Sequence, residues 1–288
     1  MRILDVKSLK TLFEKYQLGI GFTRNQKIWF NNIAGVRKEG IKYSHSYAEL
    51  EEYHKCKKDP IYFIESYCML NDKHIVLRDY QKDIVLEWTN TRFILIKNSR
   101  QMGVTLIVSL LQLYNALFNQ NENNIILTQK KDTSRHILTN IKEIYKTIPF
   151  FLQVGVSKYN ENEICFENKS KIRISSLNEQ GSAVSFLFWD CFNWCNETQA
   201  EQTYKHLIPS FTQENAKVII QCGITALSTG FFKNFITNAC QPMQSPEWNQ
   251  FKPITLYWWM VDGRDLSWKD NMINRIGEDS WYKEYETH

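Results

Sequence analysis

The segment KNSRQMGVT (97–105) carries the residue types in this sequence that best suit phosphate binding. It lies between a short apolar run, RFILI, and a longer helix-like run, LIVSLLQLYNALF. A glycine turn between a strand and a helix presents backbone N–H groups at the helix N-terminus, where the helix dipole also favours an anion. In a phosphate-binding loop (P-loop), a lysine neutralises the β- and γ-phosphates and the next residue, Ser or Thr, binds Mg²⁺. Gly103 and Thr105 have these types in these places, but Val104 stands where the lysine is expected.

Two further groups could complete a nucleotide site. The apolar run SFLFWD (185–190) ends in Asp190 and would deliver one carboxylate to the C-terminal edge of a parallel sheet, where such folds bind ligands. A carboxylate in that place can hold Mg²⁺ through water. Upstream, LRDYQKD places Tyr80 and Gln81 just before the first core strand, where an adenine could be held by stacking and by an amide. Together these features favour a nucleotide site over an ordinary strand–helix turn.

Alternating strands and helices must position these groups. Short apolar runs at 92–96, 123–129, 185–190 and 217–223 predict core strands, because a strand covered on both faces needs nearly continuous apolar residues. The segments between them have apolar residues three and four apart, which is typical of helices. NEICFENKSKIRISS alternates apolar and polar residues around Asn168-Lys169, which predicts a β-hairpin. This order predicts an α/β fold, in three layers, with a mostly parallel central sheet.

Three segments can be separated along the chain. Residues 1–72 mix short helical patterns with turns and are predicted to form an N-terminal helical lid or entry segment, with two helices separated at Asp59-Pro60. Residues 73–244 form the predicted P-loop core. From residue 245 the sequence is rich in Trp and irregular, so residues 245–288 are predicted to form a small cap on the sheet, the C-terminal part of the lid, closing with the helix SWYKEYETH.

The composition, 43% hydrophobic and 14% aromatic, is that of a folded globular protein, and the net charge of +4 is too mild to indicate a nucleic-acid partner by itself. The seven cysteines are scattered through core-like segments and the first residues show no secretory leader, so we expect reduced thiols in a cytosolic compartment, without secretion. Cys191 and Cys195 have no second pair or nearby His to complete a zinc site. The most apolar stretch, 102–118, is interrupted by polar residues, which predicts a core helix and no membrane span.

The order of these pieces resembles one known family, the large terminase subunit of tailed bacteriophages, a motor ATPase that packages double-stranded DNA into proheads. YHKCKKDPIYFIESYC resembles that family's entry helix, LRDYQKDIVLEW its adenine-recognising glutamine motif, and NSRQMGVT its SRQ-x-GKT phosphate loop. IILTQKKDTSRHILTNIKEIYKTIPFFL resembles its second strand and helix, FENKSKIRISS its hairpin, and LFWDC its apolar run ending in Asp-Glu. The resemblance is collinear and covers roughly residues 50–288.

The resemblance implies a P-loop NTPase fold that binds ATP and Mg²⁺. Catalytic positions would be Arg100, Asp190 and Cys191, with Arg100 reaching the γ-phosphate as an arginine finger supplied within the chain. Mg²⁺ would be held by Thr105 and, through water, by Asp190. The implied ATP-binding residues are Tyr80, Gln81, Lys97, Ser99, Arg100, Gln101, Met102, Gly103, Val104 and Thr105.

Some terminases carry a deviant loop with the lysine at its beginning. Lys97, three residues before Arg100, would then replace the missing lysine, since a flexible ammonium can reach a phosphate from either end of the loop. The alternative is that Lys97 is only a charge at a strand terminus.

The resemblance also implies partners and a place of action. The partners would be double-stranded DNA, a portal protein and a small terminase subunit, with a pentameric ring on the portal. The place would be the host cytoplasm during phage assembly. The family's nuclease domain has no counterpart in these 288 residues, so we expect an ATPase domain without a nuclease.

The sequence departs from the family at four places. Val104 replaces the loop lysine, and Cys191 stands where the family has a glutamate that activates the attacking water. Gln180-Gly181 stands for an arginine–glycine pair, and CGITALSTG (222–230) only loosely matches a Thr-Thr-Pro coupling motif. A thiol of ordinary pKa is a poor general base, and Glu197 is the next carboxylate along the chain. Two hypotheses therefore remain open: an active motor ATPase, or a terminase-like module that binds nucleotide or partners without efficient hydrolysis.

Overall fold

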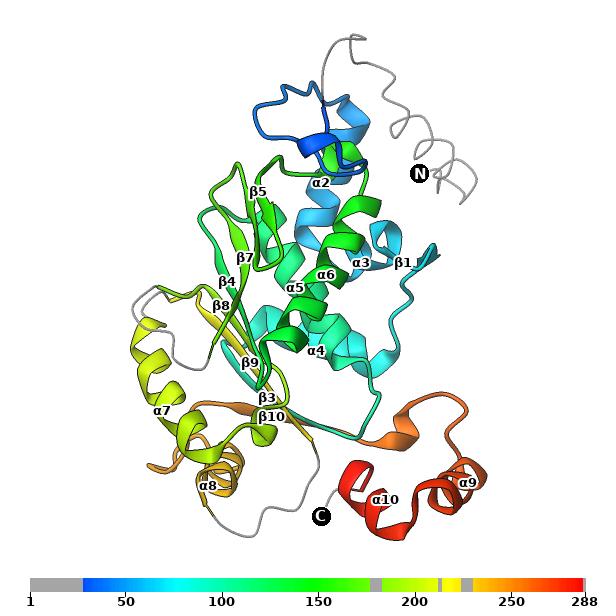
Figure 1. Cartoon of the computed structure of the whole chain (residues 1–288), viewed down its shortest axis with the longest axis vertical. Coiled ribbons are helices and arrows are strands. Elements are labelled where there is room, and N and C mark those ends of the chain that lie inside the picture. Colours follow the sequence, from blue (N-terminus) through cyan, green and yellow to red (C-terminus); the bar gives the residue numbers. More distant parts are fainter. Residues whose placement is uncertain (1–27, 177–182, 212–213, 224–229, 287–288) are drawn as a thin grey trace.

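The computed structural model describes residues 28–176, 183–211, 214–223 and 230–286 (Figure 1). Within these residues an eight-stranded sheet runs in the order β10-β3-β9-β8-β4-β7-β6-β5. Strands β10 to β7 in this order pair in parallel, and β6 and β5 add an antiparallel edge. The strands are β3 (Phe93–Asn98), β4 (Asn123–Leu127), β5 (Val156–Asn160), β6 (Glu163–Phe166), β7 (Lys171–Ser175), β8 (Phe186–Trp189), β9 (Lys217–Gly223) and β10 (Lys252–Leu256). The mostly parallel α/β sheet and the hairpin at Asn168-Lys169 are confirmed.

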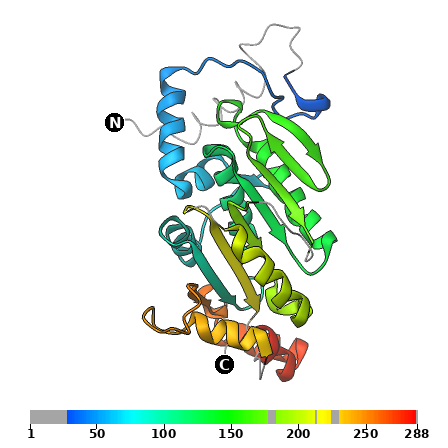
Figure 2. The ribbon, with the colours of Figure 1, turned by 90° about the vertical axis from the view of Figure 1, so that its left-hand side faces the viewer.

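Helices cover both faces of this sheet, which gives the three predicted layers (Figures 1 and 2). Ile94 and Ile96 of β3 point into the core shared with α4 (Asp79–Asn90), α5 (Val104–Phe118) and α6 (Lys131–Thr147). Leu95, between them, points into the core on the other face, under α7 (Glu197–Leu207) and α8 (Gly230–Ala239). All three side chains are fully buried, and each such burial stabilises the fold by about 1.5–3 kcal/mol.

Helix α5 is buried along almost its whole length, polar residues included. The Ser109 hydroxyl donates to the Thr105 carbonyl at 2.6 Å, and Gln112 Nε2 donates to the Ile125 carbonyl of β4 at 2.9 Å. Its polar side chains therefore bind protein groups inside a core, as predicted for this stretch. Within the described part of the chain, no helix is both long and apolar enough to cross a membrane.

The two helices predicted on either side of Asp59-Pro60 are α2 (Tyr47–Lys58) and α3 (Pro60–Tyr67). The Asp59 carboxylate accepts a hydrogen bond from the Tyr62 N–H at 2.9 Å and so caps α3, while Ser46 and Glu49 form a capping box at the start of α2. A small ribbon of β1 (Met69–Leu70) and β2 (Lys73–His74) follows. Residues 1–27 of the predicted entry segment lie outside the described residues.

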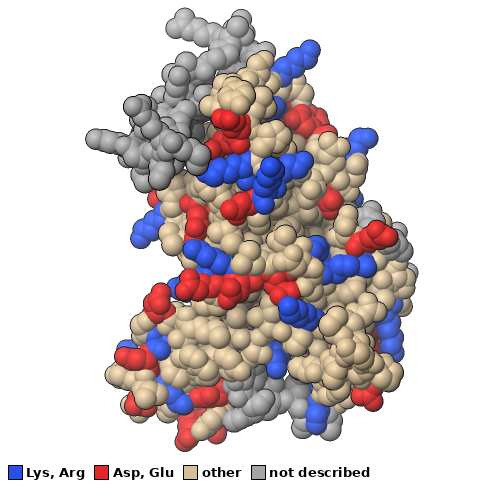
Figure 3. Space-filling view, turned by 180° about the vertical axis from the view of Figure 1, so that it is seen from behind, with Lys and Arg blue, Asp and Glu red and all other residues tan. Residues whose placement is uncertain are grey.

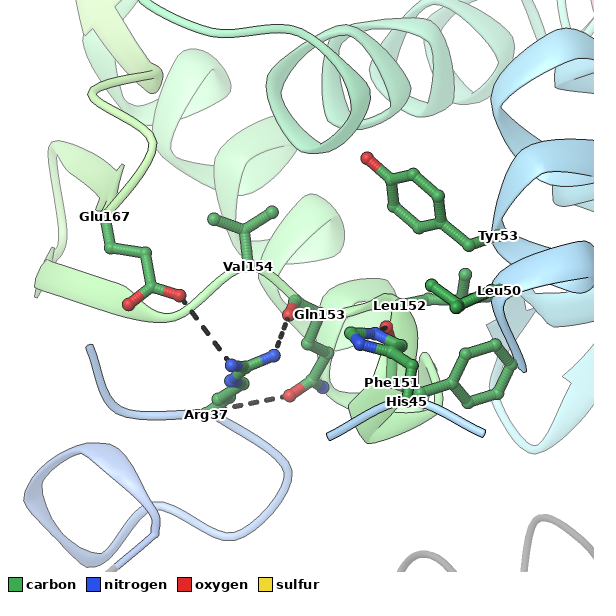
Figure 4. Close-up of a pocket in the computed structure, with 9 residues that line it drawn as sticks. All are labelled: Arg37, His45, Leu50, Tyr53, Phe151, Leu152, Gln153, Val154 and Glu167. Atoms are coloured by element: carbon green, nitrogen blue, oxygen red, sulfur yellow. Dashed lines mark hydrogen bonds and ion pairs between the residues drawn. The ribbon is translucent and has the colours of Figure 1, made fainter. Parts of the chain in front are cut away.

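Contacts of Arg37 attach residues 28–43 to the hairpin of β6 and β7, at the end of the molecule far from α9 (Leu266–Ile276) and α10 (Glu278–Glu284) (Figures 1 and 4). Its guanidinium donates to the Gln153 carbonyl at 2.7 Å and lies 3.9 Å from Glu167. The Glu167 carboxylate also accepts from the N–H groups of Gly155 and Gly40. A cavity of about 260 Å³ lies beside these contacts, with Tyr53 of α2 on its other side. Because the charged groups bind one another and the backbone, we assign them to the fold.

The C-terminal residues differ from expectation in one respect. The sequence predicts a cap over residues 245–288, but Lys252–Leu256 form β10, which pairs in parallel with β3. Its signal is weak because β10 is half-exposed and contains Pro253, which an edge strand tolerates. After it come η5 (Trp258–Met260), α9 (Leu266–Ile276) and the predicted closing helix α10 (Glu278–Glu284). The remaining short 3₁₀ turns are η1 (Phe30–Asn32), η2 (Phe150–Leu152), η3 (Phe192–Trp194) and η4 (Ile208–Ser210).

Candidate nucleotide-binding site

The loop between β3 and α5 has the backbone of a tight turn that needs glycine. Gly103 has φ +74° and Gln101 has φ +60°, both in the left-handed region. A Cβ at Gly103 would lie 2.7 Å from Gln81 Nε2, so a side chain there would displace the amide as well as strain the turn. The turn therefore needs glycine at position 103 for a specific steric reason, as the sequence pattern indicates.

Tyr80 and Gln81 hold the loop from the side of α4. The Tyr80 hydroxyl donates to the Met102 carbonyl at 2.9 Å, and Gln81 Nε2 donates to the same carbonyl at 3.3 Å. Gln81 Oε1 accepts from the Arg78 N–H at 3.0 Å. Both side chains are buried. Their place in the sequence predicts contacts to adenine. In this structure both side chains bind the loop, and an amide contact to adenine would have to replace one of these bonds.

The C-terminal segment holds the loop from another side. The Ser99 N–H donates to the Leu256 carbonyl at 3.0 Å, and its hydroxyl donates to the Tyr285 carbonyl at 2.8 Å. The Arg100 N–H donates to the Glu284 carbonyl at 2.9 Å, and its guanidinium lies 3.3 Å from the Glu284 carboxylate. The predicted ligand Ser99 thus binds protein. The predicted arginine finger, 59% exposed, is paired with Glu284.

Thr105 and Asp190, predicted to share Mg²⁺, are brought together. The Thr105 hydroxyl, in the first turn of α5, donates to Asp190 Oδ2 at 3.3 Å although the two residues are 85 positions apart. Asp190 follows β8 and is only 4% exposed. Burial raises the pKa of its carboxyl, and hydrogen bonds from Cys191 and Thr105 lower it. A hydroxyl and a carboxylate are the oxygen ligands that Mg²⁺ takes in nucleotide sites, so this pair fits the ion.

Cys191, the neighbour of Asp190, is a hydrogen-bond donor in this structure. Cys191 Sγ lies 3.5 Å from Asp190 Oδ1 as a donor, and burial raises the pKa of the thiol to about 12. The thiol is therefore protonated at neutral pH. Its backbone has φ +54°, a left-handed conformation uncommon for a residue other than glycine.

Glu197, the alternative carboxylate, has another partner. It lies in the first turn of α7, and its Oε1 accepts from the Phe232 N–H at 3.2 Å, which caps the N-terminus of α8. The structure gives it a role in joining two helices.

Lys97 lies at the end of β3, in register with Cys222 of β9. Because side chains alternate along a strand, it leaves the sheet on the same face as Leu95, under α7 and α8, and not on the face that α5 covers. Its ammonium has no hydrogen-bond or ion-pair partner in the described part of the chain. Its role as a substitute lysine stays a prediction.

Two departures from the family cannot be placed completely. Gln180-Gly181 lies outside the described residues, and so do residues 224–229 of the coupling segment 222–230. The part that is described, at the end of β9, is tied to the loop after β8: the Gly223 N–H donates to Asn193 Oδ1 at 3.0 Å. Asn193 was not predicted.

Arg264 contacts the loop, and nothing in the sequence predicts this. Between η5 and α9, it donates from Nη1 to the Arg100 carbonyl at 3.1 Å and from Nη2 to the Gln101 carbonyl at 3.3 Å. It comes from an irregular segment more than 160 positions after Arg100 and Gln101, where no local pattern connects it with phosphate binding.

A parallel sheet with a left-handed glycine turn before a buried helix, and an acidic strand end against that helix, defines the chain as a protein of the P-loop class. A family model described as "Terminase large subunit, T4likevirus-type, N-terminal" matches residues 95–238, half of the chain. The chain therefore belongs to the large terminase subunit family, in the region of its N-terminal part.

Solved structures agree with this assignment. The large terminase of bacteriophage HK97 has a TM-score of 0.58 at 14% identity, covering 81% of this chain and 49% of that one. A variant of the large terminase ATPase domain of Thermus phage P74-26 has a TM-score of 0.57 at 12% identity, covering 73% of this chain and 93% of that domain. The large terminase of a thermophilic bacteriophage has a TM-score of 0.56 at 14% identity, covering 74% of this chain and 53% of that one. The latter protein has also been solved with ATP-γ-S.

Because the sequence identities are low, the similarity to these solved structures establishes only the fold of this chain. The chain spans about half the length of two of these terminases and nearly all of the P74-26 ATPase domain.

Proposed function

We propose that this chain binds Mg-ATP in the loop 99–105 and acts as the ATPase domain of a large terminase, powering the movement of double-stranded DNA into proheads. The observation that carries this proposal is the contact between the Thr105 hydroxyl and Asp190 Oδ2 at 3.3 Å. Two oxygen ligands from distant parts of the chain meet at the start of α5, beside a turn whose N–H groups can face a phosphate.

Each residue then has a defined task. The N–H groups of the loop would bind the β- and γ-phosphates, and Thr105 and Asp190 would hold Mg²⁺, which neutralises phosphate charge when bound. Arg100 would have to leave Glu284 to reach the γ-phosphate, where it would stabilise the charge of the transition state. Lys97 would add charge from the end of β3.

A second candidate function rests on Cys191. Phosphoryl transfer to water needs a group that orients the nucleophile, and a buried thiol whose pKa is about 12 is a hydrogen-bond donor here. Under this alternative the chain binds ATP and partners but hydrolyses ATP slowly.

The partners are also proposals from family membership: double-stranded DNA, a portal protein and a small terminase subunit, in a ring on the portal in the host cytoplasm. The face of the molecule in Figure 3 shows a row of acidic side chains across its middle, with basic side chains above and below. Binding to the DNA backbone uses clusters of Lys and Arg. On this face such side chains lie on both sides of the acidic row.

Calorimetric titration of Mg-ATP tests the site. Thr105→Ala removes the hydroxyl proposed to bind Mg²⁺ and should weaken binding by on the order of tenfold, about 1.4 kcal/mol. Thr139→Ala is the matched control, because its hydroxyl bonds only to its own helix, at the Arg135 carbonyl, on an exposed part of α6. Equal affinity in parent and Thr105→Ala would contradict the site. Phosphate release with and without double-stranded DNA then separates the motor from the slow alternative.

A further inference from the structure

We infer that Arg264 is a positioning residue for the phosphate loop: its guanidinium holds two loop carbonyls so that the neighbouring N–H groups face the phosphates. This inference rests on the proposed Mg-ATP site and adds to it a residue from the C-terminal segment.

The guanidinium is well placed for this task. Arg264 Nη1 donates to the Arg100 carbonyl at 3.1 Å and lies 3.8 Å from Met102 Sδ, and Nη2 donates to the Gln101 carbonyl at 3.3 Å. Its central carbon lies 4.7 Å from the centre of the Trp268 ring. Trp268 packs in turn against Trp258 and Trp281. The side chain is therefore fixed between an aromatic cluster and the loop.

The consequence for the loop follows from peptide geometry. In a trans peptide the C=O of one residue and the N–H of the next point in opposite directions. Because the carbonyls of Arg100 and Gln101 point toward Arg264, the N–H groups of Gln101 and Met102 point away from Arg264. Tyr80 and Gln81 do the same for the Gly103 N–H by holding the Met102 carbonyl. None of these three N–H groups donates to an acceptor among the described residues.

Two distant parts of the chain thus arrange three successive N–H groups in one cradle, the arrangement that binds anions in P-loops. A positive charge on the carbonyl side also polarises the peptides and makes their N–H groups stronger donors. Because Val104 brings no charge to the loop, Arg264 supplies a cation at hydrogen-bond distance from its backbone. Burial lowers the pKa of this guanidinium, but Arg stays charged at neutral pH.

The geometry also explains why arginine is required. One guanidinium reaches two carbonyls because its N–H groups form a rigid fork, whereas a lysine ammonium is a point charge on a flexible stem. Arg264→Lys should therefore keep the charge but lose the simultaneous hold on both carbonyls.

The test compares Arg264→Met, Arg264→Lys and the parent by calorimetric titration with Mg-ATP, inorganic triphosphate and adenosine. Arg264→Met should lower the affinity for Mg-ATP and for triphosphate by roughly tenfold or more and leave the affinity for adenosine unchanged. Arg264→Lys should recover only part of the lost affinity. Arg275→Met is the matched control: it removes the same charge from an exposed site on α9 and should bind like the parent. If Arg264 had a purely structural role, Arg264→Met would lower the affinity for all three ligands together, or would lower only the melting temperature.

The outcomes separate this inference from the proposed function. A parent that does not bind Mg-ATP would overturn both. A parent that binds, with Arg264→Met binding equally well, would overturn only the role of Arg264. Should Arg264→Met fail to fold, Arg264→Lys decides: parent-like affinity for triphosphate would contradict the two-carbonyl hold, and a reduced affinity would support it.

Discussion

The two sides of the candidate site are the loop after β3 and the end of β8. By the resemblance to the family, each side lacks one charged group, but the structure around the two positions differs. On the loop side Val104 replaces a lysine, yet the backbone is held by Tyr80, Gln81 and Arg264. On the β8 side Cys191 replaces a glutamate and donates to Asp190. The free energy of binding a phosphate has contributions from several backbone N–H groups and nearby cations, so several residues can compensate for one missing lysine. A general base must be one group at one place, and there the loss is harder to replace.

The largest expected effect is on turnover, at the β8 side. Cys191→Glu places a carboxylate where the resemblance to the family implies a water-activating group, and general-base positioning is typically worth roughly 10²–10⁴-fold in rate. If the second candidate function holds, turnover is slow in the parent and rises strongly in Cys191→Glu, measured as phosphate release at saturating Mg-ATP. Cys191→Gln, similar in size but uncharged, should stay slow. Brisk turnover in the parent would support the motor ATPase and contradict the slow alternative, and Glu197 would then be the first residue to examine as the base.

The next effect concerns charge on the loop side. If Lys97 replaces the missing lysine, Lys97→Ala loses a charge-assisted contact of about 1.5–3 kcal/mol, or ten- to a hundredfold in affinity for Mg-ATP. Val104→Lys, measured beside it by calorimetry, should add little to the parent but restore binding in the Lys97→Ala background. A neutral Lys97→Ala with tighter binding in Val104→Lys would show that Lys97 has no part in the site.

A smaller effect is expected from the pair that holds Arg100. Glu284→Gln removes the ion pair but keeps the backbone contact to the Arg100 N–H, so Arg100 is freed toward the nucleotide. Exposed ion pairs contribute about 0–1 kcal/mol, so Mg-ATP affinity should rise by at most about fivefold. Glu201→Gln breaks a comparable exposed pair with Lys205 on α7 and should change nothing. Weaker binding in Glu284→Gln would mean that the pair supports the loop and does not restrain Arg100.

The smallest effect is on stability without Mg²⁺. Burial raises the pKa of the Asp190 carboxyl, so the folded state keeps its proton at a pH where the unfolded state has lost it. Stability therefore falls as pH rises from the ordinary Asp pKa of about 3.9 through the folded value. Asp190→Asn should then melt above the parent at pH 7 in EDTA, by about 2–4 °C for each kcal/mol removed. The gap should shrink at pH 4, and Asp83→Asn, an exposed control on α4, should show none. A lower melting temperature for Asp190→Asn at pH 7 would contradict this account.

The parts of the molecule that could be predicted are those whose signals are local. The apolar runs of β3, β4, β8 and β9 and the glycine turn at Gly103 depend on neighbours in sequence, and their places were predicted. The meeting of Thr105 with Asp190 followed because the parallel order brings strand ends to one edge.

The rest depends on contacts between distant residues. The half-exposed β10 becomes a strand only because β3 offers an edge, and Arg264 reaches the loop only because β10 carries the chain there. The binding of Tyr80 and Gln81 to the loop likewise follows from how α4 packs, which neither residue's type indicates.

The pairing of β10 with β3 has a consequence for synthesis on the ribosome. One edge of β3 can be covered only after about 150 further residues have been made. The Ser99 N–H also has its acceptor, the Leu256 carbonyl, in this late strand. At about 5–20 residues per second this is a delay of about 8–30 seconds. During that time the strand beside the proposed phosphate site exposes unpaired backbone, which can pair with other chains. Assembly of the site should therefore be among the last steps as the chain emerges, and the nascent protein should need protection from aggregation until residue 256 is free.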